Sequence, residues 1–405
     1  FQFMIDHPQL FGLETEAARR RLSEASTPFI ERRRDLLAQI RPVSHTAPAM
    51  LDGSGEDEYV FIRGAWKKRG ETVPRRFLEV FRGEGPADVE PPATSHQPSA
   101  NTGSGRLELA LQMVDPEQTP ILPRVIVNRI WQHYFGRGIV PTPDDFGRMG
   151  QLPSHPELLD WLARDLVAGD WSLKRIHRQI LLSAAYRMQS AIDDGDDSAV
   201  SLDPRPSTLD PENILLHRMN IKRLEGEIIR DQVLAVSGRL DDQIYGKSIP
   251  VHLTAFMEGR GRPGQSGPVD GHGRRSLYIS VRRNFPDPFF QAFDFPNPHT
   301  TIGRRSVSNV PAQALALMNN PLIVEQSRVW ADRLLREARD ATVEQRIRTL
   351  YASAFSREPT GEELSSATAF IESQAAEYNA STDDPRVWAD YCHVLINVKE
   401  FVFVQ

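Results

Sequence analysis

Residues 122–136 have the sequence LPRVIVNRIWQHYFG, which carries the pattern of an amphipathic helix. Pro123 suits the first turn of a helix, and Gly136 suits the position directly after the last turn. The apolar residues between them recur at i, i+3, i+4, i+7 and i+8, the spacing of one helix face: Val127, Ile130, Trp131, Tyr134 and Phe135. This stretch predicts a helix that buries an aromatic-rich stripe.

Two more helices are expected directly after it. Ser154 and Glu157 have the spacing of a capping box, and an apolar periodic run follows them. Ser172 is placed to cap a third helix, with Trp171 and Ile176 at the two positions of a hydrophobic staple. We expect these three helices to form one compact unit.

The remaining helical patterns lie nearer the C-terminus. A helical segment is expected from Asp210 to about Gly238, and others start near Pro311 and after Pro321. Capping boxes are indicated at two later starts, and an Asp-Pro pair marks a last helix: Thr342 with Gln345, Thr360 with Glu363, and Asp384 with Pro385. This part of the chain therefore predicts a helical bundle.

Two short stretches are expected to be β-strands, and the second of them has a clear alternation of faces. One is EYVFIRG at 58–64, and the other is RRSLYISVRR at 274–283, with Leu277, Ile279 and Val281 on one face. Segments 83–105 and 193–206 are rich in loop-forming residues and are expected to be exposed connections. A basic helix near residues 28–40 is interpreted as an appendage.

Together these patterns predict a mostly α fold with minor β, an α+β architecture. Five segments are expected along the chain: a connector or the end of a preceding module at 1–57, a short strand and Gly/Pro/Ser-rich loop at 58–104, a helical core at 105–238, a strand and Gly/Arg-rich loop element at 239–308, and a C-terminal helical bundle at 309–405.

The composition excludes several classes of function. The net charge of −6 gives no global attraction to nucleic acid, so an anion would have to bind to a local patch. One cysteine excludes an intrachain disulfide framework, and the haem-attachment pattern C-x-x-C-H is absent, so we expect no cofactor in this segment. No apolar run reaches the length of about 18 residues that a membrane span needs. The first residues, FQFMIDHPQL, resemble neither an initiator segment nor a signal peptide, and we interpret the chain as an interior piece of a longer polypeptide.

The stretch FMEGRGRPGQSGPVDGHGRR at 256–275 contains the best candidate for a binding site. Its GRGRPG matches the dinucleotide fingerprint G-x-G-x-x-G, but Pro263 and further glycines exclude the helix that this fingerprint must open. A flexible arginine-bearing loop remains. Guanidinium groups bind carboxylate, sulfate or phosphate, and glycines allow backbone N–H groups to face the same anion.

The candidate ligand-binding residues come from this loop, from the stretch after it and from a second arginine pair: Arg260, Arg262, His272, Arg274, Arg275, Arg282, Arg283, Arg304 and Arg305. His272 could alternatively be a general base or a solvated loop residue. The alternative for the arginines is that they pair with nearby acids and hold irregular backbone in place: Glu258, Asp270, Asp287 and Asp294.

Other groupings are interpreted as structural. Four residues resemble a metal-binding set without the spacing of a known metal motif, and we expect no metal site: Asp144, Asp145, His155 and Asp160. Arg223, Glu227 and Asp231 are spaced four apart, which is typical of an ion-pair network on a helix, although two carboxylates could also serve acid/base chemistry. Cys392 is expected in the core, because nothing near it in sequence would hold a thiolate.

A nucleic-acid-binding helix is not favoured either. Lys174, Arg175, His177 and Arg178 give the third helix a basic face, but this face covers little more than one turn. We therefore expect no nucleic-acid partner.

Several blocks resemble one known family. They include RVIVNRIWQHYFGRGIVPTPDDFG, SHPELLDWLA, WSLKRIHRQILLSAAYR, MNIKRLEGEIIRDQVLAVSGRL, VHLTAFMEGRGRPGQSGP, GRRSLYISVRRN and GRRSVSNVPAQALALMNNP. In this order, from about Tyr59 to Gln405, they are similar to the planctomycete-specific domain of unknown function at the C-terminal end of planctomycete cytochrome c domain proteins. The resemblance implies export from the cytoplasm, a haem c-bearing cytochrome module upstream and a second upstream domain of unknown function. The family has no established catalytic residues that could be carried over.

The arginine cluster and the family resemblance together lead to a functional expectation. We expect an extracytoplasmic recognition or scaffold module, in the periplasm or at the cell surface, for an anionic ligand such as a polysaccharide. The alternative is an enzyme, hydrolytic or redox-coupled, that acts on polysaccharide through carboxylate and histidine side chains. A third possibility is a surface for assembly alone.

Overall fold

A computed structural model describes residues 15–39, 57–73, 104–190 and 209–404. The expected loops at 83–105 and 193–206 lie almost wholly outside the described residues. The chain divides into two compact units, one made of residues 1–49 with 243–248 and one made of 50–242 with 249–405. Among the described residues, no helix combines the length and the apolar character needed to cross a bilayer.

In the first unit the described structure is mainly helix α2, Glu16–Gln39. The sequence pattern predicted a basic helix only from about residue 28. The helix begins a dozen residues earlier and contains Pro28 in its interior. Arg20 and Glu24 form an ion pair of 3.1 Å, one turn apart on its surface.

The second unit opens with a two-stranded antiparallel hairpin and a short helix. Strand β1, Glu58–Phe61, pairs with β2, Arg69–Val73, and the 3-10 turn η2, Ile62–Gly64, follows β1. The predicted strand at 58–64 is therefore confirmed in its first half. Helix α3, Arg106–Val114, follows and buries none of its side chains.

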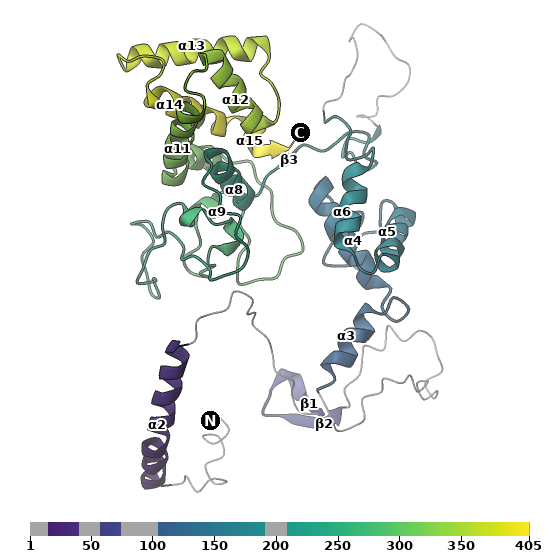
Figure 1. Cartoon of the computed structure of the whole chain (residues 1–405). Helices are drawn as coiled ribbons and strands as arrows, with labels where there is room; N and C mark the ends of the chain where they lie inside the picture. The colour runs from purple at the N-terminus through teal and green to yellow at the C-terminus, as the bar shows by residue number, and fades with distance from the viewer. Residues whose placement is uncertain (1–14, 40–56, 74–103, 191–208, 405) are drawn as a thin grey trace. The chain divides into compact units, whose positions relative to one another are not determined.

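The helix predicted at 122–136 is confirmed and forms a core with its two successors (Figure 1). Helix α4 is Ile121–Phe135, α5 is Pro156–Ala168 and α6 is Leu173–Leu182. Val127, Leu162 and Ile176 are at most 3% exposed and belong to one apolar cluster. The compact unit of three helices follows directly from the apolar periodicity of each.

A larger apolar cluster lies in the C-terminal bundle. The helices of this bundle are α8, Gly226–Ser237; α9, Pro288–Ala292; α10, Pro311–Asn319; α11, Pro321–Glu337; α12, Val343–Phe355; α13, Gly361–Glu377; α14, Pro385–Asn397; and α15, Lys399–Val402. Strands β3, Lys222–Arg223, and β4, Phe403–Val404, form a small antiparallel pair. Trp388 and Cys392 are fully buried, so the prediction that Cys392 is a core residue is confirmed. Burial raises the pKa of the Cys392 thiol, which keeps it protonated.

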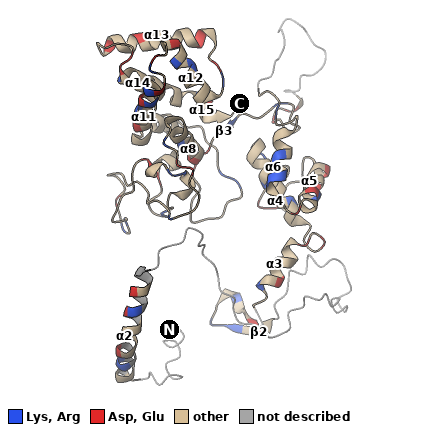
Figure 2. Cartoon of the chain, in the orientation of Figure 1, with Lys and Arg blue, Asp and Glu red and all other residues tan. Residues whose placement is uncertain are grey.

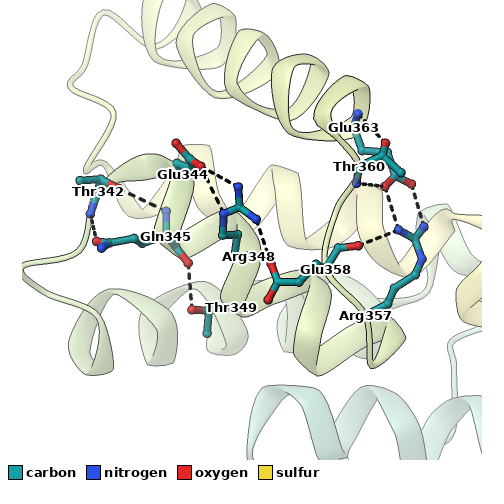
Figure 3. Close-up of polar contacts among 9 residues, drawn as sticks. All are labelled: Thr342, Glu344, Gln345, Arg348, Thr349, Arg357, Glu358, Thr360 and Glu363. Atoms are coloured by element: carbon teal, nitrogen blue, oxygen red, sulfur yellow. Dashed lines mark hydrogen bonds and ion pairs between the residues drawn. The ribbon is translucent and has the colours of Figure 1, made fainter.

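Both predicted capping boxes of the bundle are present (Figure 3). The Thr342 hydroxyl accepts the Gln345 backbone N–H, and the Gln345 side chain accepts the Thr342 backbone N–H. Thr360 and Glu363 make the same reciprocal pair at the start of α13. The predicted start of α14 is also confirmed, because the Asp384 carboxylate accepts the Arg386 backbone N–H at 2.9 Å.

The predicted strand at 274–283 is wrong. Residues 276–278 form a 3-10 turn, η5, and Leu277 and Val281 are 63% and 58% exposed. The Asp231 carboxylate of α8 accepts both the backbone N–H and the hydroxyl of Ser276 at 2.7 Å. A side chain of α8 therefore binds a backbone group of this segment that would otherwise pair with a neighbouring strand.

The helix predicted from Asp210 to about Gly238 is wrong in its first half. Residues 210–221 form turns, bends and irregular backbone, and α8 begins only at Gly226. The Asp210 carboxylate accepts the backbone N–H groups of Ile214 and Leu215 at 2.8 and 2.7 Å. Such local side-chain bonds compete with helical bonds.

The capping box predicted at Ser154 and Glu157 is also wrong. Helix α5 starts at Pro156 with His155 at the N-cap position, and the Ser154 hydroxyl donates to the Ile139 carbonyl at 3.3 Å. Ser172 does stand at the N-cap position of α6, but its side chain makes no capping bond.

The fold class is confirmed as mostly α with minor β. Within 239–308, the helical elements are the 3-10 turns η4, Gly271–Gly273, and η5, Ser276–Tyr278, and the short helix α9. The two isolated β-bridges of this segment pair Asp241 with Arg274 and Ile249 with Ile279.

Candidate functional site

The arginines predicted to bind a ligand divide into two groups. Those of the first group pair with acids of the protein. Arg305 makes a bidentate contact of 2.8 Å with Glu227 and lies 3.3 Å from Glu225. Arg275 lies 3.8 Å from Asp231. These guanidinium groups are partly neutralised and hold the loops to α8.

Arg274 belongs to the same paired group. It is 8% exposed, lies 3.8 Å from the Asp241 carboxylate and stacks over the Tyr278 ring at 4.0 Å from its centroid. A guanidinium buried in this way stabilises its loop and is not accessible to a large ligand.

A further arginine, which comes from α8, organises this loop. Arg230 of α8 is 3% exposed, and its guanidinium donates to the carbonyls of Asp270 and Arg274 at 2.7 and 2.9 Å and to the Ser276 hydroxyl at 3.1 Å. A Cβ at Gly271, where φ is +60°, would lie 2.5 Å from this guanidinium. The irregular backbone at 270–276 is therefore built around one buried cation.

The second group is exposed. The side chains of Arg260, Arg282, Arg283 and Arg304 make no hydrogen bond or ion pair with any residue that the structure describes. Arg262 donates through Nε to the Met257 carbonyl at 2.7 Å and has no carboxylate partner in the described ranges. These guanidinium groups are available to a ligand.

A small apolar core brings the two loops that carry four of these arginines together. Val251, Leu253 and Phe285 are buried against one another, with Met257 and Ile279 packed on them. The Ile249 backbone exchanges hydrogen bonds of 2.8 Å with Tyr278 and Ser280. We call segments 251–262 and 279–285 the arginine loops; they carry Arg260, Arg262, Arg282 and Arg283.

Three of the four acids that could have neutralised these arginines are engaged elsewhere. Asp270 pairs with Arg239 at 3.0 Å, and Asp294 pairs with Arg223 at 2.7 Å. Asp287 caps α9 by accepting the Phe289 backbone N–H at 2.8 Å, and burial raises its pKa. Glu258 is exposed.

Among the described residues, the His272 side chain has no acid/base partner. It is exposed in the left-handed region, with φ 57°, and its backbone N–H donates to Asp270 at 2.9 Å. The predicted helix-face pair between Arg223 and Glu227 does not form, because Arg223 lies on β3 and pairs with Asp294. Glu227 and Asp231 are bound separately, by Arg305 and Ser276.

The four residues that resembled a metal-binding set also have separate roles. Asp145 accepts the Gly147 backbone N–H, His155 contacts Ser154, and Asp160 pairs with Arg124 at 2.7 Å. Asp144 accepts the Gly303 backbone N–H at 2.8 Å. Over the described residues, no three His, Cys, Asp or Glu side chains are grouped so that they could hold a metal ion.

The basic residues of the third helix lie on α6, where Figure 2 shows a band of positive charge next to the acidic α5. Arg175 pairs with Asp165 of α5 at 2.5 Å. His177 Nδ1 lies 2.8 Å from the Tyr134 hydroxyl, on the side that faces α4. Lys174 and Arg178 are exposed.

A polar cluster that the sequence reading missed surrounds the start of α8. Lys222 Nζ donates to the His133 carbonyl. Burial lowers the pKa of His133, and the charges of Lys222, Arg129 and Arg305 act in the same direction, whereas Glu225 opposes them. Positions 133 and 222 are far apart in sequence, so no spacing motif could have indicated this cluster.

A cavity of about 410 Å³ is lined by residues from α4, the turn after it and a distant loop: Arg129, Pro143, Asp144, Thr301, Ile302 and Gly303. Its volume falls within the range of about 300–1,000 Å³ that is typical of small-molecule sites. No sequence motif indicates this cavity, because Arg129 and Asp144 lie more than 150 positions from the lining residues Thr301, Ile302 and Gly303.

The fold and the site together define a mostly helical module that presents an arginine-bearing loop element. The chain belongs to the family PSD1, protein of unknown function (DUF1553), whose family model matches residues 105–371. No curated protein and no solved structure matches the chain.

Proposed function

We propose that this chain is an extracytoplasmic recognition module that binds an acidic polysaccharide through the arginine loops. The observation that supports this proposal is that some of the candidate arginines are paired with acids and others are not. Arg274, Arg275 and Arg305 pair with acids, whereas Arg260, Arg262, Arg282 and Arg283 are exposed without a carboxylate partner in the described residues.

The chemistry of the exposed group suits a polyanion. A guanidinium cannot lose its proton near neutral pH, and its planar fork matches a carboxylate or a sulfate with two parallel hydrogen bonds. The small core of Val251, Leu253 and Phe285 fixes the backbone that carries these groups. Fixing the backbone lowers the entropy that a ligand would have to overcome on binding.

A polymer is favoured over a small anion, because the arginines are spread over two loops. Phe256, which is 96% exposed, lies on one of these loops and offers an apolar face to a sugar ring. The net charge of −6 provides no general attraction to a polyanion, so binding would depend on the local field of these loops.

The cellular setting is part of the proposal. The resemblance to the planctomycete domain supports export to the periplasm or cell surface. It also supports partnership with an upstream c-type cytochrome module, which would carry the haem, and with a second upstream domain. In this setting the chain would hold its haem-bearing partner near acidic polysaccharide.

A polysaccharide-acting enzyme is the less supported alternative. It would need carboxylates and histidine around one pocket, but Glu227, Asp231 and His155 are each bound by different partners. Of the acid/base candidates, only Asp144 lines the cavity.

Calorimetric titration with polygalacturonate tests the proposal, with the fully methyl-esterified polymer as the neutral control. We expect the Arg260→Ala/Arg262→Ala and Arg282→Ala/Arg283→Ala variants each to lose about tenfold or more in affinity, because charge-assisted hydrogen bonds are worth about 1.5–3 kcal/mol. Arg348→Ala, at a partly exposed arginine of α12 that is paired within the bundle, should bind like the parent. Equal affinity in the parent and both double variants would contradict the proposal.

A further inference from the structure

Next to the cavity-lining Arg129, α4 makes buried polar contacts with the segment that follows it. Asn128 is fully buried, and its side chain donates to the Val140 carbonyl at 3.0 Å and accepts the Val140 backbone N–H at 2.8 Å. These bonds hold the segment after α4 against the helix. Arg129, the next residue, is exposed and lines the cavity without a carboxylate partner in the described ranges.

A tight turn presents Asp144 from the same segment. The Thr142 hydroxyl donates to the Asp145 carbonyl at 2.8 Å, and the Asp145 carboxylate accepts the Gly147 backbone N–H at 2.8 Å. Asp144 itself takes no part in these turn bonds, and it lines the cavity.

The third wall is the loop 301–303, which is held at its C-terminal end. Gly303 donates its backbone N–H to Asp144 Oδ2 at 2.8 Å, and Arg305 binds Glu227 of α8 two residues later. A Cβ at Gly303 would lie 1.6 Å from Asp144 Oδ1, so only glycine permits this approach. The hydrogen bond uses Oδ2 and leaves Oδ1 as an acceptor.

The cavity therefore offers the guanidinium of Arg129, which no carboxylate of the described residues neutralises, and Asp144 Oδ1, which can accept a hydrogen bond from a hydroxyl group. A doubly charged anion such as phosphate is disfavoured by the adjacent Asp144, whereas a singly charged carboxylate suits the guanidinium fork. Hydroxyl groups next to the carboxylate could donate to Asp144 Oδ1. A cavity of about 410 Å³ has room for one sugar ring.

We propose that this cavity binds a sugar acid, with the carboxylate of the ligand on Arg129 and a neighbouring hydroxyl on Asp144. The site uses none of the residues of the arginine loops, and neither proposal depends on the other.

Titration of the full chain with galacturonate, compared with galactose, tests the site. The carboxylate should improve binding about tenfold or more, since a charged pair of this kind is a strong hydrogen bond. Arg129→Gln should remove this preference, whereas Arg148→Gln, at an exposed arginine of the turn after Asp144, should keep it.

Two further variants separate the site from a general loss of folding. Asp144→Asn is isosteric and can still accept the Gly303 N–H, so it should keep the fold and weaken both sugars. Gly303→Ala should displace the Asp144 side chain and abolish binding while the thermal midpoint shows that the chain is folded.

Three results would overturn the assignment. Galacturonate could bind no better than galactose, or Arg129→Gln could behave like Arg148→Gln. Galacturonate binding could also be lost in Arg260→Ala/Arg262→Ala and kept in Arg129→Gln, which would move the monosaccharide to the arginine loops. If the chain binds galacturonate but not polygalacturonate, this result would contradict the proposed function of the arginine loops and leave the assignment of the cavity intact.

Discussion

At the scale of single residues, arginines connect segments that are distant in sequence. Arg357 donates to both oxygens of Glu363 at 2.7 and 2.8 Å and to both oxygens of Glu400 at 2.7 and 2.8 Å. Figure 3 shows the first of these contacts beside the capping box of α13. One cation thus ties the start of α13 to the last helix of the chain.

This contact predicts a pH-dependent contribution to stability. The Arg357 guanidinium is the main cause that lowers the pKa of Glu363 from 4.5 to about 2. A carboxyl whose pKa is lowered by folding stabilises the protein above its unfolded pKa, and this contribution is lost as the pH falls from 4.5 toward 2.

Glu363→Gln is the test variant, because Gln345 shows that glutamine can complete a capping box in this bundle. We expect the variant to be less stable by about 1 kcal/mol at pH 7, a small value because solvent screens a partly exposed pair. Urea unfolding at a series of pH values should show the difference shrinking below pH 4.5. A difference that stays constant down to pH 2 would contradict this account.

Substitution of Arg230 is expected to lower the stability of the protein by a larger amount. Arg230→Met would leave the carbonyls of Asp270 and Arg274 buried without their donor, and we expect a loss of about 3 kcal/mol or more, as for a broken buried ionic contact. Hydrogen exchange should quicken at 270–276. Arg239→Met is the control: its side chain is 54% exposed, and the cost should stay below about 1 kcal/mol.

At the scale of elements, the starts of helices in the bundle were predictable because their signals are local. The Thr342, Thr360 and Asp384 caps are bonds between residues two or three apart. Ser154 has the same local signal but bonds to Ile139, fifteen residues away. The strand predicted from the alternation at 274–283 does not form for a similar reason, because the Asp231 carboxylate of α8 accepts the Ser276 backbone N–H.

The difference between a real and an apparent cap can be measured. Thr360→Ala should destabilise the protein by about 1 kcal/mol, the usual loss for an N-cap side chain. Ser172→Ala should change the stability by no more than about 0.5 kcal/mol, as for an ordinary surface substitution, since the Ser172 side chain makes no capping bond. Thermal unfolding of both variants checks the contrast, and equal losses would contradict the assigned caps.

At the scale of the whole molecule, the fold class followed from periodicity, whereas the candidate sites did not. The arginine loops were predicted as an arginine cluster, but the sequence could not separate Arg274, Arg275 and Arg305 from the exposed arginines, because their acid partners come from α8 and from Asp241. The cavity between Arg129 and Gly303 joins positions more than 170 residues apart, which no local pattern indicates.

The two large apolar clusters of the second unit predict that this unit unfolds in separate parts. Ile176 and Ile347 are both fully buried, one in each cluster. Ile176→Ala should cost about 2–5 kcal/mol and quicken hydrogen exchange in α4, α5 and α6 while α11 and α14 stay protected. Ile347→Ala should do the reverse. Uniform loss of protection in either variant would show a single cooperative unit.

The most direct test of the proposed function is hydrogen-exchange mapping of the full chain with and without polygalacturonate. We predict slower exchange at 251–262 and 279–285, weakened by added salt because exposed charges are screened. Protection confined to other segments, or no protection at polymer concentrations that saturate calorimetric binding, would contradict the assignment of the ligand to the arginine loops.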